Sequence, residues 1–422
     1  MTGVIVVGGG QAAGQLAAGL RQQGYTAPIR IFSDEAYPPY QRPPLSKQFL
    51  SGEWALDRLF LRPNNFYLQK EVKLHTGVTV ASIDRAKKTI TTTSSETHEY
   101  SDLVIATGSR ARRLTIPGSD LSNVFYLRTA DDVNAIRGAF LPGQGLPGQG
   151  LPGRRLVIVG GGYIGLEVAA VAIKTGLTVT VLEMESRILQ RVTTQAMSDF
   201  YHRIHSEHGV DIRVSTRVSE FRGNGTVQSI ACADGTSIDA DLVVVGVGVL
   251  PNVEIAGAAG LAVDNGIVVD SSCRTTDAHV YAIGDCARGF NEILGRSIRL
   301  ESVPNAMEQA RVVAANICGK QSTYDTMPWF WSDQYDLKLQ MVGFAADGEQ
   351  AVVRGDPAAN AFMTFYLTGG RVVAADAVNQ ARDFLITRQL CERRTPVDGG
   401  FLADVHTDLK QLLSQDGLGR PG

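Results

Sequence analysis

Short runs of apolar residues that end in glycine clusters occur at two places in the chain. The first run, Val4 to Val7, ends at a glycine triplet, and a helical pattern follows in which Leu16 and Leu20 share one face. A second apolar run, Ile29 to Phe32, comes next and stops at polar residues. A short apolar run, a turn and then an amphipathic helix are typical of a strand–helix–strand unit. The chain therefore starts with a predicted βαβ unit.

The same pattern returns about 150 residues later. Leu156 to Val159 is a predicted strand, Ile164 to Lys174 a helix, and Val179 to Leu182 the next strand. A second glycine triplet lies at the turn between the first strand and the helix. Two such openings in one chain indicate two dinucleotide-binding folds.

The last part of the chain has a different pattern. From about Met327 it becomes aromatic, and short alternating strands follow at Ala361 to Leu367 and Arg371 to Ala375. Asp404 to Leu413 has the spacing of a closing amphipathic helix. The predicted fold class is therefore α/β, with two Rossmann-like domains and a C-terminal α+β domain.

Composition excludes several classes of protein. The 422 residues carry a net charge of −3, so no global field favours nucleic acid or an anionic membrane. The five cysteines are scattered without a CxxC or CxxxxC spacing, which argues against a disulfide framework, a zinc site and a dithiol redox centre. The chain shows neither a signal peptide nor a membrane span, so we expect a cytoplasmic protein. His202 and His205 share a helical face, but His208 turns away from it, so we expect no metal site.

The first glycine turn matches a dinucleotide fingerprint. Gly8 permits a tight turn, Gly10 lets backbone amides approach a pyrophosphate, and the small Ala13 allows the helix to pack close to the strand. The phosphates would lie at the helix N-terminus, where free N–H groups favour anions. Asp34, at the end of the second strand, is placed to accept hydrogen bonds from a ribose.

The second fingerprint is complete, with Gly160, Gly162 and Gly165 followed by Glu183 at the end of the next strand. A carboxylate at that place binds the ribose 2′-hydroxyl of NAD and repels the 2′-phosphate of NADP. Arg187 could receive such a phosphate, so NADPH stays an alternative to NADH, which we favour.

Two further turns follow predicted strands. Ala106 to Gly108 is a turn of small residues after an apolar run, and Tyr281 to Asp285 places a carboxylate at the tip of a loop. An acidic group there suits a polyol such as the ribityl chain of a flavin. The first fingerprint is therefore predicted to bind the flavin nucleotide.

These motifs resemble those of the two-dinucleotide flavoproteins and, within them, the NADH-dependent ferredoxin reductases of oxygenase systems. The match extends over nearly the whole chain. It is carried by RPPLSK (Arg42 to Lys47), GGGYIGLEVAA (Gly160 to Ala170), GDCAR (Gly284 to Arg288), ESVPNAMEQAR (Glu301 to Arg311) and PWFWSDQYDLKLQMVG (Pro328 to Gly343). The repeat LPGQGLPGQGLPG, Leu141 to Gly153, departs from the family, and we interpret it as an exposed loop insertion.

The resemblance implies that the two Rossmann-like domains are arranged as in glutathione reductase. It also implies domain limits and cofactor contacts. We expect a discontinuous FAD-binding domain at 1–115 and 248–326, an NAD-binding domain at 116–247 and a C-terminal domain at 327–422. Besides the fingerprint residues, the implied FAD contacts are Ala12, Asp34, Lys47, Val80, Arg128, Asp285 and Val303. The implied NAD contacts are Gly160, Gly162, Tyr163, Ile164, Gly165 and Glu183.

The resemblance also implies catalytic roles. Lys47 and Glu167 resemble the pair that lies beside the flavin, where the lysine stabilises the reduced ring and the glutamate orients the lysine and the nicotinamide. Trp331 would pack near the edge of the flavin or nicotinamide, although an aromatic triplet is more often part of a core. Arg62 and Arg311 would belong to a basic rim for an acidic ferredoxin.

The predicted function is hydride transfer from NADH to FAD and then electron transfer to a [2Fe–2S] ferredoxin that serves a cytochrome P450 or a ring-hydroxylating oxygenase. Within the enzymes, the alternatives are a rubredoxin reductase and a monodehydroascorbate-type reductase. From another class, the same architecture serves as a flavin-binding interaction protein, as in apoptosis-inducing factor. The near-neutral charge argues against nucleic-acid binding by such a protein.

Overall fold

The computed structural model describes residues 2–140 and 153–414, and these fold into two compact units. The first unit contains the chain up to Arg42 together with Leu56–Arg110 and Val249–Pro328. The second unit contains Pro43–Ala55, the described part of Ala111–Gly248, and the described chain from Trp329 on. All but the last residue of the predicted loop insertion, 141–153, lies outside the described residues. Each unit contains one of the two fingerprints.

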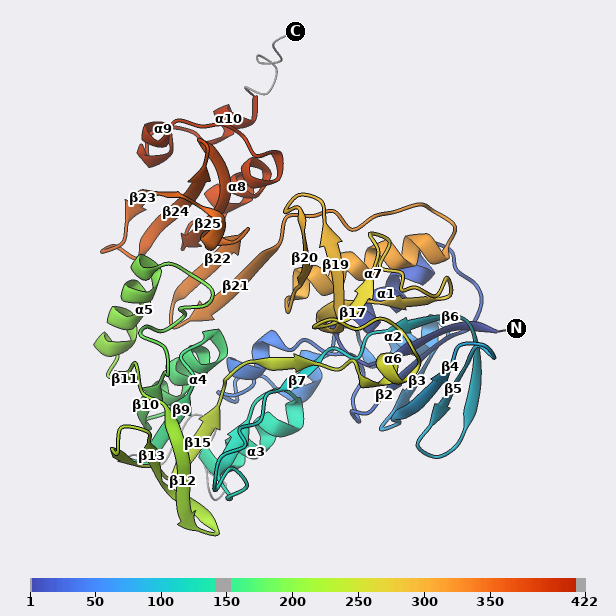
Figure 1. Ribbon diagram of the computed structural model, residues 1–422, viewed down its shortest axis with the longest axis horizontal. Helices are drawn as coiled ribbons and strands as arrows, with labels where there is room; N and C mark the ends of the chain where they lie inside the picture. The colour runs from blue at the N-terminus through green and yellow to red at the C-terminus, as the bar shows by residue number, and fades with distance from the viewer. Residues whose placement is uncertain (1, 141–152, 415–422) are drawn as a thin grey trace. The chain divides into compact units, whose positions relative to one another are not determined.

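The first unit is built around a mostly parallel sheet (Figure 1). Strand β1 lies in its middle, pairs on both sides with parallel strands and is completely buried, which explains its unbroken run of apolar residues. An antiparallel hairpin extends the sheet from β6. The strands are β1 (Gly3–Val7), β2 (Ile29–Ser33), β3 (Val72–Thr76), β4 (Val80–Asp84), β5 (Thr89–Thr92), β6 (Thr97–Ile105) and β18 (Val280–Ala282).

Two helices of the first unit pack against one another beside this sheet. Leu16 and Leu20 of α1 are fully buried, and Gly19 lets α7 approach, since an added Cβ would lie 3.2 Å from the Cβ of Ala314. Ser302 caps α7 by accepting the N–H of Asn305 at 3.3 Å. The helices are α1 (Gln11–Gln22), α2 (Asn64–Gln69), α6 (Glu254–Ala258) and α7 (Val303–Ile317). Smaller strands are β7 (Ser109–Ala111), β16 (Val249–Pro251), β17 (Ile267–Val269), β19 (Ala287–Asn291) and β20 (Arg296–Arg299).

The second unit repeats the parallel arrangement. Its strands lie in the order β11, β10, β9, β15 and β8, with the fingerprint strand β9 in the middle. These strands are β8 (Val124–Tyr126), β9 (Arg155–Val159), β10 (Thr178–Leu182), β11 (Asp211–Arg213) and β15 (Leu242–Val245). The helices are α3 (Ala130–Phe140), α4 (Tyr163–Lys174) and α5 (Gln195–Glu207), and a small antiparallel sheet contains β12 (Val218–Asn224), β13 (Thr226–Cys232) and β14 (Ser237–Asp239).

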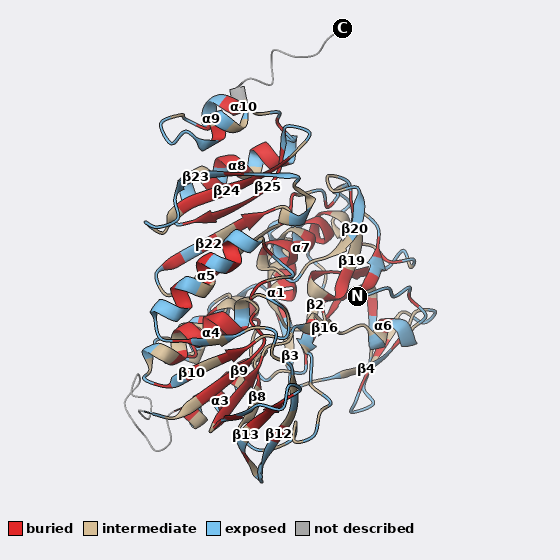
Figure 2. Ribbon diagram, turned by 60° about the vertical axis from the view of Figure 1, so that its left-hand side comes forward, coloured by how far each residue is buried: buried red, intermediate tan, exposed pale blue. Residues whose placement is uncertain are grey.

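An antiparallel sheet and its helices complete the second unit. The strand order is β21, β22, β25, β24 and β23, and the central strands are buried almost throughout (Figure 2). The strands are β21 (Trp329–Gln334), β22 (Leu337–Val342), β23 (Gln350–Asp356), β24 (Ala361–Thr368) and β25 (Arg371–Val378). The helices are α8 (Ala381–Arg393), α9 (Gly399–Ala403) and α10 (Lys410–Ser414). The predicted fold class, α/β with a C-terminal α+β part, is confirmed.

The predicted closing helix over Asp404 to Leu413 is wrong in its first part, and only its residues from Lys410 on are helical. Its first residues form a turn, in which the Asp404 carboxylate accepts the N–H of His406 at 3.0 Å and the hydroxyl of Thr407 at 2.7 Å. Such local side-chain bonds compete with a helix. The helix begins only at Lys410, whose N–H donates to Asp408 at 3.1 Å.

A buried carboxylate joins the antiparallel sheet to the segment before α5. Asp376 on β25 is fully buried among its partners and accepts hydroxyl hydrogen bonds from Thr193 and Tyr366, both at 2.8 Å. Thr194 lies 3.1 Å from the same tyrosine hydroxyl. Burial raises the pKa of Asp376 to about 6, although its two hydroxyl partners act in the opposite direction.

The Asp376→Asn substitution should change how stability depends on pH. The folded chain keeps a proton on Asp376 that the unfolded chain has lost above its usual pKa of 3.8, so the free energy of unfolding falls as pH rises from about 4 to about 6. The loss is about 3 kcal/mol. Urea unfolding at pH 4, 5, 6 and 7 measures the free energy of unfolding of both proteins. As pH rises from 4 to 6, the value for the variant should increase relative to that of the wild type by about this amount. A difference independent of pH would contradict this expectation.

Candidate functional site

The two fingerprint turns have the same backbone geometry. Gly8 has a φ of +116°, and its N–H donates to the Phe32 carbonyl at 2.8 Å; Gly160 has a φ of +111°, and its N–H donates to Leu182 at 2.8 Å. A Cβ added at Gly8 would lie 2.1 Å from the carbonyl oxygen of Ala106. Both the φ values and the close approach of backbone require glycine.

The second glycine of each fingerprint leaves space for a ligand. Gly10 and Gly162 are the N-caps of α1 and α4, where the described chain supplies no side-chain cap, and a Cβ added to either would meet no described atom within 4 Å. At Gly165, by contrast, an added Cβ would lie 2.2 Å from the Gly160 carbonyl oxygen, so this glycine serves helix packing. Open space at a helix start with uncapped N–H groups fits a pyrophosphate in both units.

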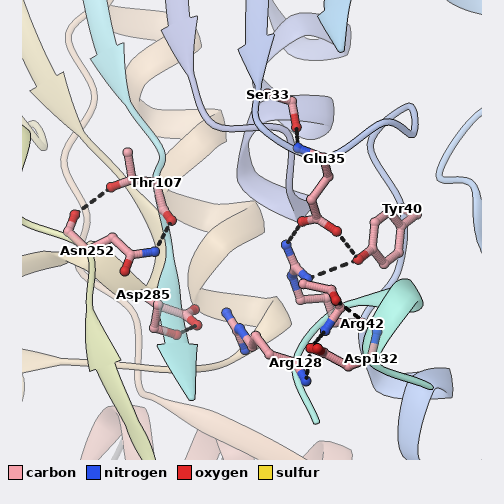
Figure 3. A network of polar contacts seen from close by, with 11 residues as sticks. Ser33, Glu35, Tyr40, Arg42, Thr107, Arg128, Asp132, Asn252 and Asp285 are labelled. Atoms are coloured by element: carbon pink, nitrogen blue, oxygen red, sulfur yellow. Dashed lines mark hydrogen bonds and ion pairs between the residues drawn. The ribbon is translucent and has the colours of Figure 1, made fainter. Parts of the chain in front are cut away.

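Three turns of the first unit meet at the carboxyl ends of β1, β6 and β18. Thr107 exchanges hydrogen bonds with Asn252, its hydroxyl donating at 2.6 Å and its carbonyl accepting the amide at 2.9 Å (Figure 3). Asp285 accepts the hydroxyl of Ser109 at 2.7 Å, and a Cβ at Gly284 would lie 3.4 Å from that of the buried Ala12. The predicted residues Gly8, Gly10, Ala12, Ala13 and Asp285 therefore share one edge. Asn252 was missed because it lies 145 positions from Thr107.

Two neighbouring carboxylates follow β2, and their surroundings differ. Asp34, the predicted ribose partner, follows β2 directly and is exposed. The next residue, Glu35, accepts a hydrogen bond from the Tyr40 hydroxyl and pairs with Arg42 at 2.5 Å (Figure 3). Arg42 also donates to Tyr40 at 3.1 Å. The sequence placed Arg42 in a motif but did not predict its carboxylate partner.

The remaining predicted flavin contacts lie at the starts of elements. Val80 begins β4 and Val303 begins α7, and both are half-buried in the first unit. Arg128 lies in the second unit, where its N–H donates to Asp132 at 3.0 Å. Asp132 and Thr129 each accept the other's backbone N–H, which is a capping box at the start of α3.

Glu183 holds the second fingerprint turn. Its carboxylate accepts the N–H of Gly161 at 2.7 Å and that of Glu185 at 2.9 Å. Arg187 uses its guanidinium within its own loop, donating to the carbonyls of Gln190, Thr193 and Thr194 and to the hydroxyl of Ser198. The arginine is thus engaged, which argues against its receiving a 2′-phosphate.

The first two residues of α4 are Tyr163, whose ring packs within the second unit, and Ile164, whose side chain is exposed. The hydroxyl of Tyr163 donates to the Met341 sulfur at 2.8 Å, and its ring lies 5.1 Å from that of Phe330. Burial raises the pKa of Tyr163 well above its ordinary value, so this residue stays neutral. Ile164 is 43% exposed at the helix start.

A buried ion pair lies within the second unit. Lys47 Nζ is 2.6 Å from Glu167 Oε2, and the two side chains are only 11% and 2% exposed. Ser46 donates to the same carboxylate oxygen, and Ser332 donates to Oε1 at 2.7 Å. Glu167 projects from α4, while Lys47 follows the short 3₁₀ turn of the PPLS motif, where its N–H donates to Pro44 at 3.0 Å. Both oxygens of the glutamate are therefore satisfied, as a buried charge requires.

A cavity of about 480 Å³ reaches this pair from within the second unit. Lys174 on α4 and Asp333 and Tyr335 at the end of β21 also line it. The cavity gives water access to a pair that is otherwise enclosed.

The aromatic triplet on β21 is half-buried. The ring of Trp331 lies 5.6 Å from that of Trp329, which in turn contacts Phe384 at 6.1 Å and lies under the guanidinium of Arg388 at 4.7 Å. Trp331 is thus held against an aromatic cluster.

The cysteines offer no pair for redox exchange. All five are free, and all except the half-buried Cys318 are buried. Burial raises the pKa of the Cys286 thiol beside Asp285, so this residue is a packing residue. Among the described residues, no group of three His, Cys, Asp or Glu side chains is arranged to hold a metal ion. None of the described helices combines the length and apolar character that crossing a membrane requires.

Comparisons with known proteins agree with this geometry. The profile of the pyridine nucleotide-disulphide oxidoreductases matches residues 2–310, and that of a reductase C-terminal domain matches residues 329–413. Putidaredoxin reductase CamA of Pseudomonas putida is 41% identical over 97% of this chain and 96% of its own length. A rubredoxin-NAD(+) reductase of the same organism is 39% identical over 83% of this chain and 89% of its own length.

A solved structure has the same fold. The reductase chain in the covalent putidaredoxin reductase–putidaredoxin complex superposes with a TM-score of 0.93, at 40% identity and 99% coverage of both chains. The similarity extends over both units and both fingerprints.

Proposed function

Because this chain belongs to the pyridine nucleotide-disulphide oxidoreductase family, we propose that it is an NADH-dependent ferredoxin reductase with FAD as its flavin. The observation that carries the proposal is the pair of fingerprint turns, which have equal geometry and open space at both helix starts. Two dinucleotides are what a hydride transfer between nicotinamide and flavin requires.

The first unit supplies the flavin nucleotide site. Gly8 and Gly10 would leave room for the pyrophosphate. Asp34 would accept hydrogen bonds from the adenosine ribose, and Asp285 would accept them from the ribityl chain. Ala12, Ala13, Val80 and Val303 would line the site, and Lys47 and Arg128 are further proposed flavin contacts. Asn252 holds the turn at Thr107 and Ser109 holds Asp285, so both contacts are fixed before binding.

The second unit supplies the NADH site. Gly160, Gly162, Tyr163, Ile164 and Gly165 surround the helix start, and Glu183 would accept hydrogen bonds from the adenosine ribose. Arg187 is engaged within its loop, and Glu183 and Glu185 make the site acidic. Both features favour NADH over NADPH.

Lys47 and Glu167 would act at the reacting rings. When bound, FAD would supply the conversion of a two-electron hydride into single electrons. The ammonium of Lys47, largely buried and held by Glu167, would stabilise negative charge on the flavin. Trp331 would cover the edge of the site.

A [2Fe–2S] ferredoxin is the proposed electron acceptor, and an oxygenase of the cytochrome P450 or ring-hydroxylating class its consumer. The buried, scattered cysteines support direct transfer from flavin to iron–sulfur centre without a thiol relay. Arg311, 59% exposed and paired with Glu308 at 2.9 Å, would contribute to the docking rim. Five free thiols suit a reducing compartment, so we place the protein in the cytoplasm.

The test is an anaerobic titration of the yellow protein with NADH, followed by addition of electron acceptors. We expect NADH to bleach the flavin within milliseconds to seconds, and a [2Fe–2S] ferredoxin to restore its colour at least about tenfold faster than rubredoxin or ascorbyl radical does. Faster reoxidation by rubredoxin or ascorbyl radical would favour the alternative reductases. Slow reduction with a long-lived charge-transfer band would favour a flavin-binding interaction protein.

A further inference from the structure

A line of hydrogen bonds leads from Glu167 to a histidine that the site does not otherwise use. Ser332 Oγ lies 2.7 Å from Glu167 Oε1, Gln334 Nε2 lies 3.2 Å from that hydroxyl, and Gln334 Oε1 lies 2.8 Å from His205 Nε2. His205 Nδ1 lies 2.9 Å from the Tyr335 hydroxyl. Ser332, Gln334 and His205 are at most 1% exposed, so solvent does not interrupt the line.

The carboxylate of Glu167, which pairs with Lys47, determines the direction of every bond in this line. A carboxylate only accepts, so the Ser332 hydroxyl must donate to it and its oxygen must accept the amide N–H of Gln334. The Gln334 carbonyl then faces His205, which must carry its proton on Nε2. Nδ1 is left as an acceptor for Tyr335. Each donor therefore points toward Glu167, and the dipoles add.

The surroundings of His205 keep it neutral. Burial lowers its pKa to about 4, an effect that the bond to Gln334 opposes and that His208 and His202 on the same helix reinforce. The ring of Tyr335 lies 5.0 Å from that of His205, and the Lys174 ammonium lies 5.7 Å from the tyrosine ring. A neutral ring with one donor and one acceptor is what the line requires.

We propose that His205 is a positioning residue for the reaction: its Nε2–H tautomer orients Gln334 and Ser332 so that the serine hydroxyl holds the Glu167 carboxylate in place and paired with Lys47. This inference rests on the proposed function, in which the Lys47–Glu167 pair acts on the flavin. His205 lies at the end of α5 and touches neither Lys47 nor Glu167 in the contacts described, so its effect is transmitted through Gln334 and Ser332.

The first test measures the tautomer. Nitrogen NMR of the holoprotein labelled with ¹⁵N-histidine, without NADH, should show His205 neutral with its proton on Nε2 from pH 6 to pH 8. His205→Gln identifies the His205 signals by difference, and His202→Ala, one turn earlier on α5, should leave the tautomer unchanged. A proton on Nδ1, or a charged ring at pH 7, would overturn the proposal.

The second test is a double-mutant cycle on flavin reduction by NADH. His205→Leu should slow reduction by roughly tenfold, the value of about one hydrogen bond to a charged group, and His205→Gln should restore most of the rate because its amide also donates to Gln334. In a Glu167→Gln background, His205→Leu should have no further effect. Equal slowing in both backgrounds, or slowing in neither, contradicts the proposal.

A failure of the proposed function can be distinguished from a failure of the positioning role of His205. If Lys47→Ala reduces its flavin at the normal rate while His205 shows the Nε2–H tautomer, the proposed function fails and the hydrogen-bond line stands. If Lys47→Ala is slow and the cycle shows no coupling between His205 and Glu167, the proposed function stands and the positioning role fails.

Discussion

Replacing Lys47 by alanine should leave a yellow protein whose flavin is reduced by NADH at least about 10² times more slowly, because a positioned donor to developing charge typically contributes that much. The same change leaves the 2% exposed carboxylate of Glu167 with only its two serine donors. Loss of one partner of a buried ion pair costs about 3–5 kcal/mol of stability. Anaerobic stopped-flow absorbance and urea unfolding measure the two effects separately.

Two further variants separate the chemistry from the folding cost. Lys174→Ala removes a lysine that lines the same cavity but pairs with no carboxylate in the contacts described, and its reduction rate should be normal. Lys47→Ala combined with Glu167→Gln removes the unpaired charge, so stability should recover while reduction stays slow. A Lys47→Ala protein with normal reduction by NADH would remove the catalytic role.

Valine in place of the second fingerprint glycine should abolish one cofactor site and spare the other. Gly10→Val should yield a colourless protein without FAD, and Gly162→Val a yellow protein that NADH no longer reduces. Both glycines have extended backbone and an added Cβ meets no described atom within 4 Å, so the fold tolerates valine while the pyrophosphate does not. Losing two or more charge-assisted bonds weakens binding by about 10²-fold or more.

The flavin-to-protein absorbance ratio and NADH binding by calorimetry check these expectations. Gly138→Val is the matched control, because Gly138 lies on α3 with equally open space and belongs to neither fingerprint. It should keep both cofactors and unfold within about 0.5 kcal/mol of the wild type. Loss of FAD from Gly162→Val, or retention of FAD and NADH by both fingerprint variants, would contradict the assignment of the two sites.

The strands and helices around both fingerprints were predictable because their causes are local. An apolar run buried on both faces, a glycine that must adopt positive φ and an amphipathic helix are all readable within about 30 residues. The same reasoning failed at Asp404, where one side chain bonds the next backbone groups and delays the helix to Lys410. The predicted domain limits and cofactor contacts stay predictions.

By itself, the sequence determined the two nucleotide folds, the order of their elements and the residue types at each turn, since these follow from propensities and spacings along the chain. Only the tertiary structure decided which side chains meet: Ser332 reaches Glu167 across 165 positions, and His205 reaches Gln334 across 129. The tertiary structure also showed that Arg187 donates to the Thr193 carbonyl of its own loop and that the buried Asp376 accepts the Thr193 hydroxyl. Contacts between distant segments depend on how the helices and strands pack, and the hydrophobic periodicity of the sequence does not predict that packing.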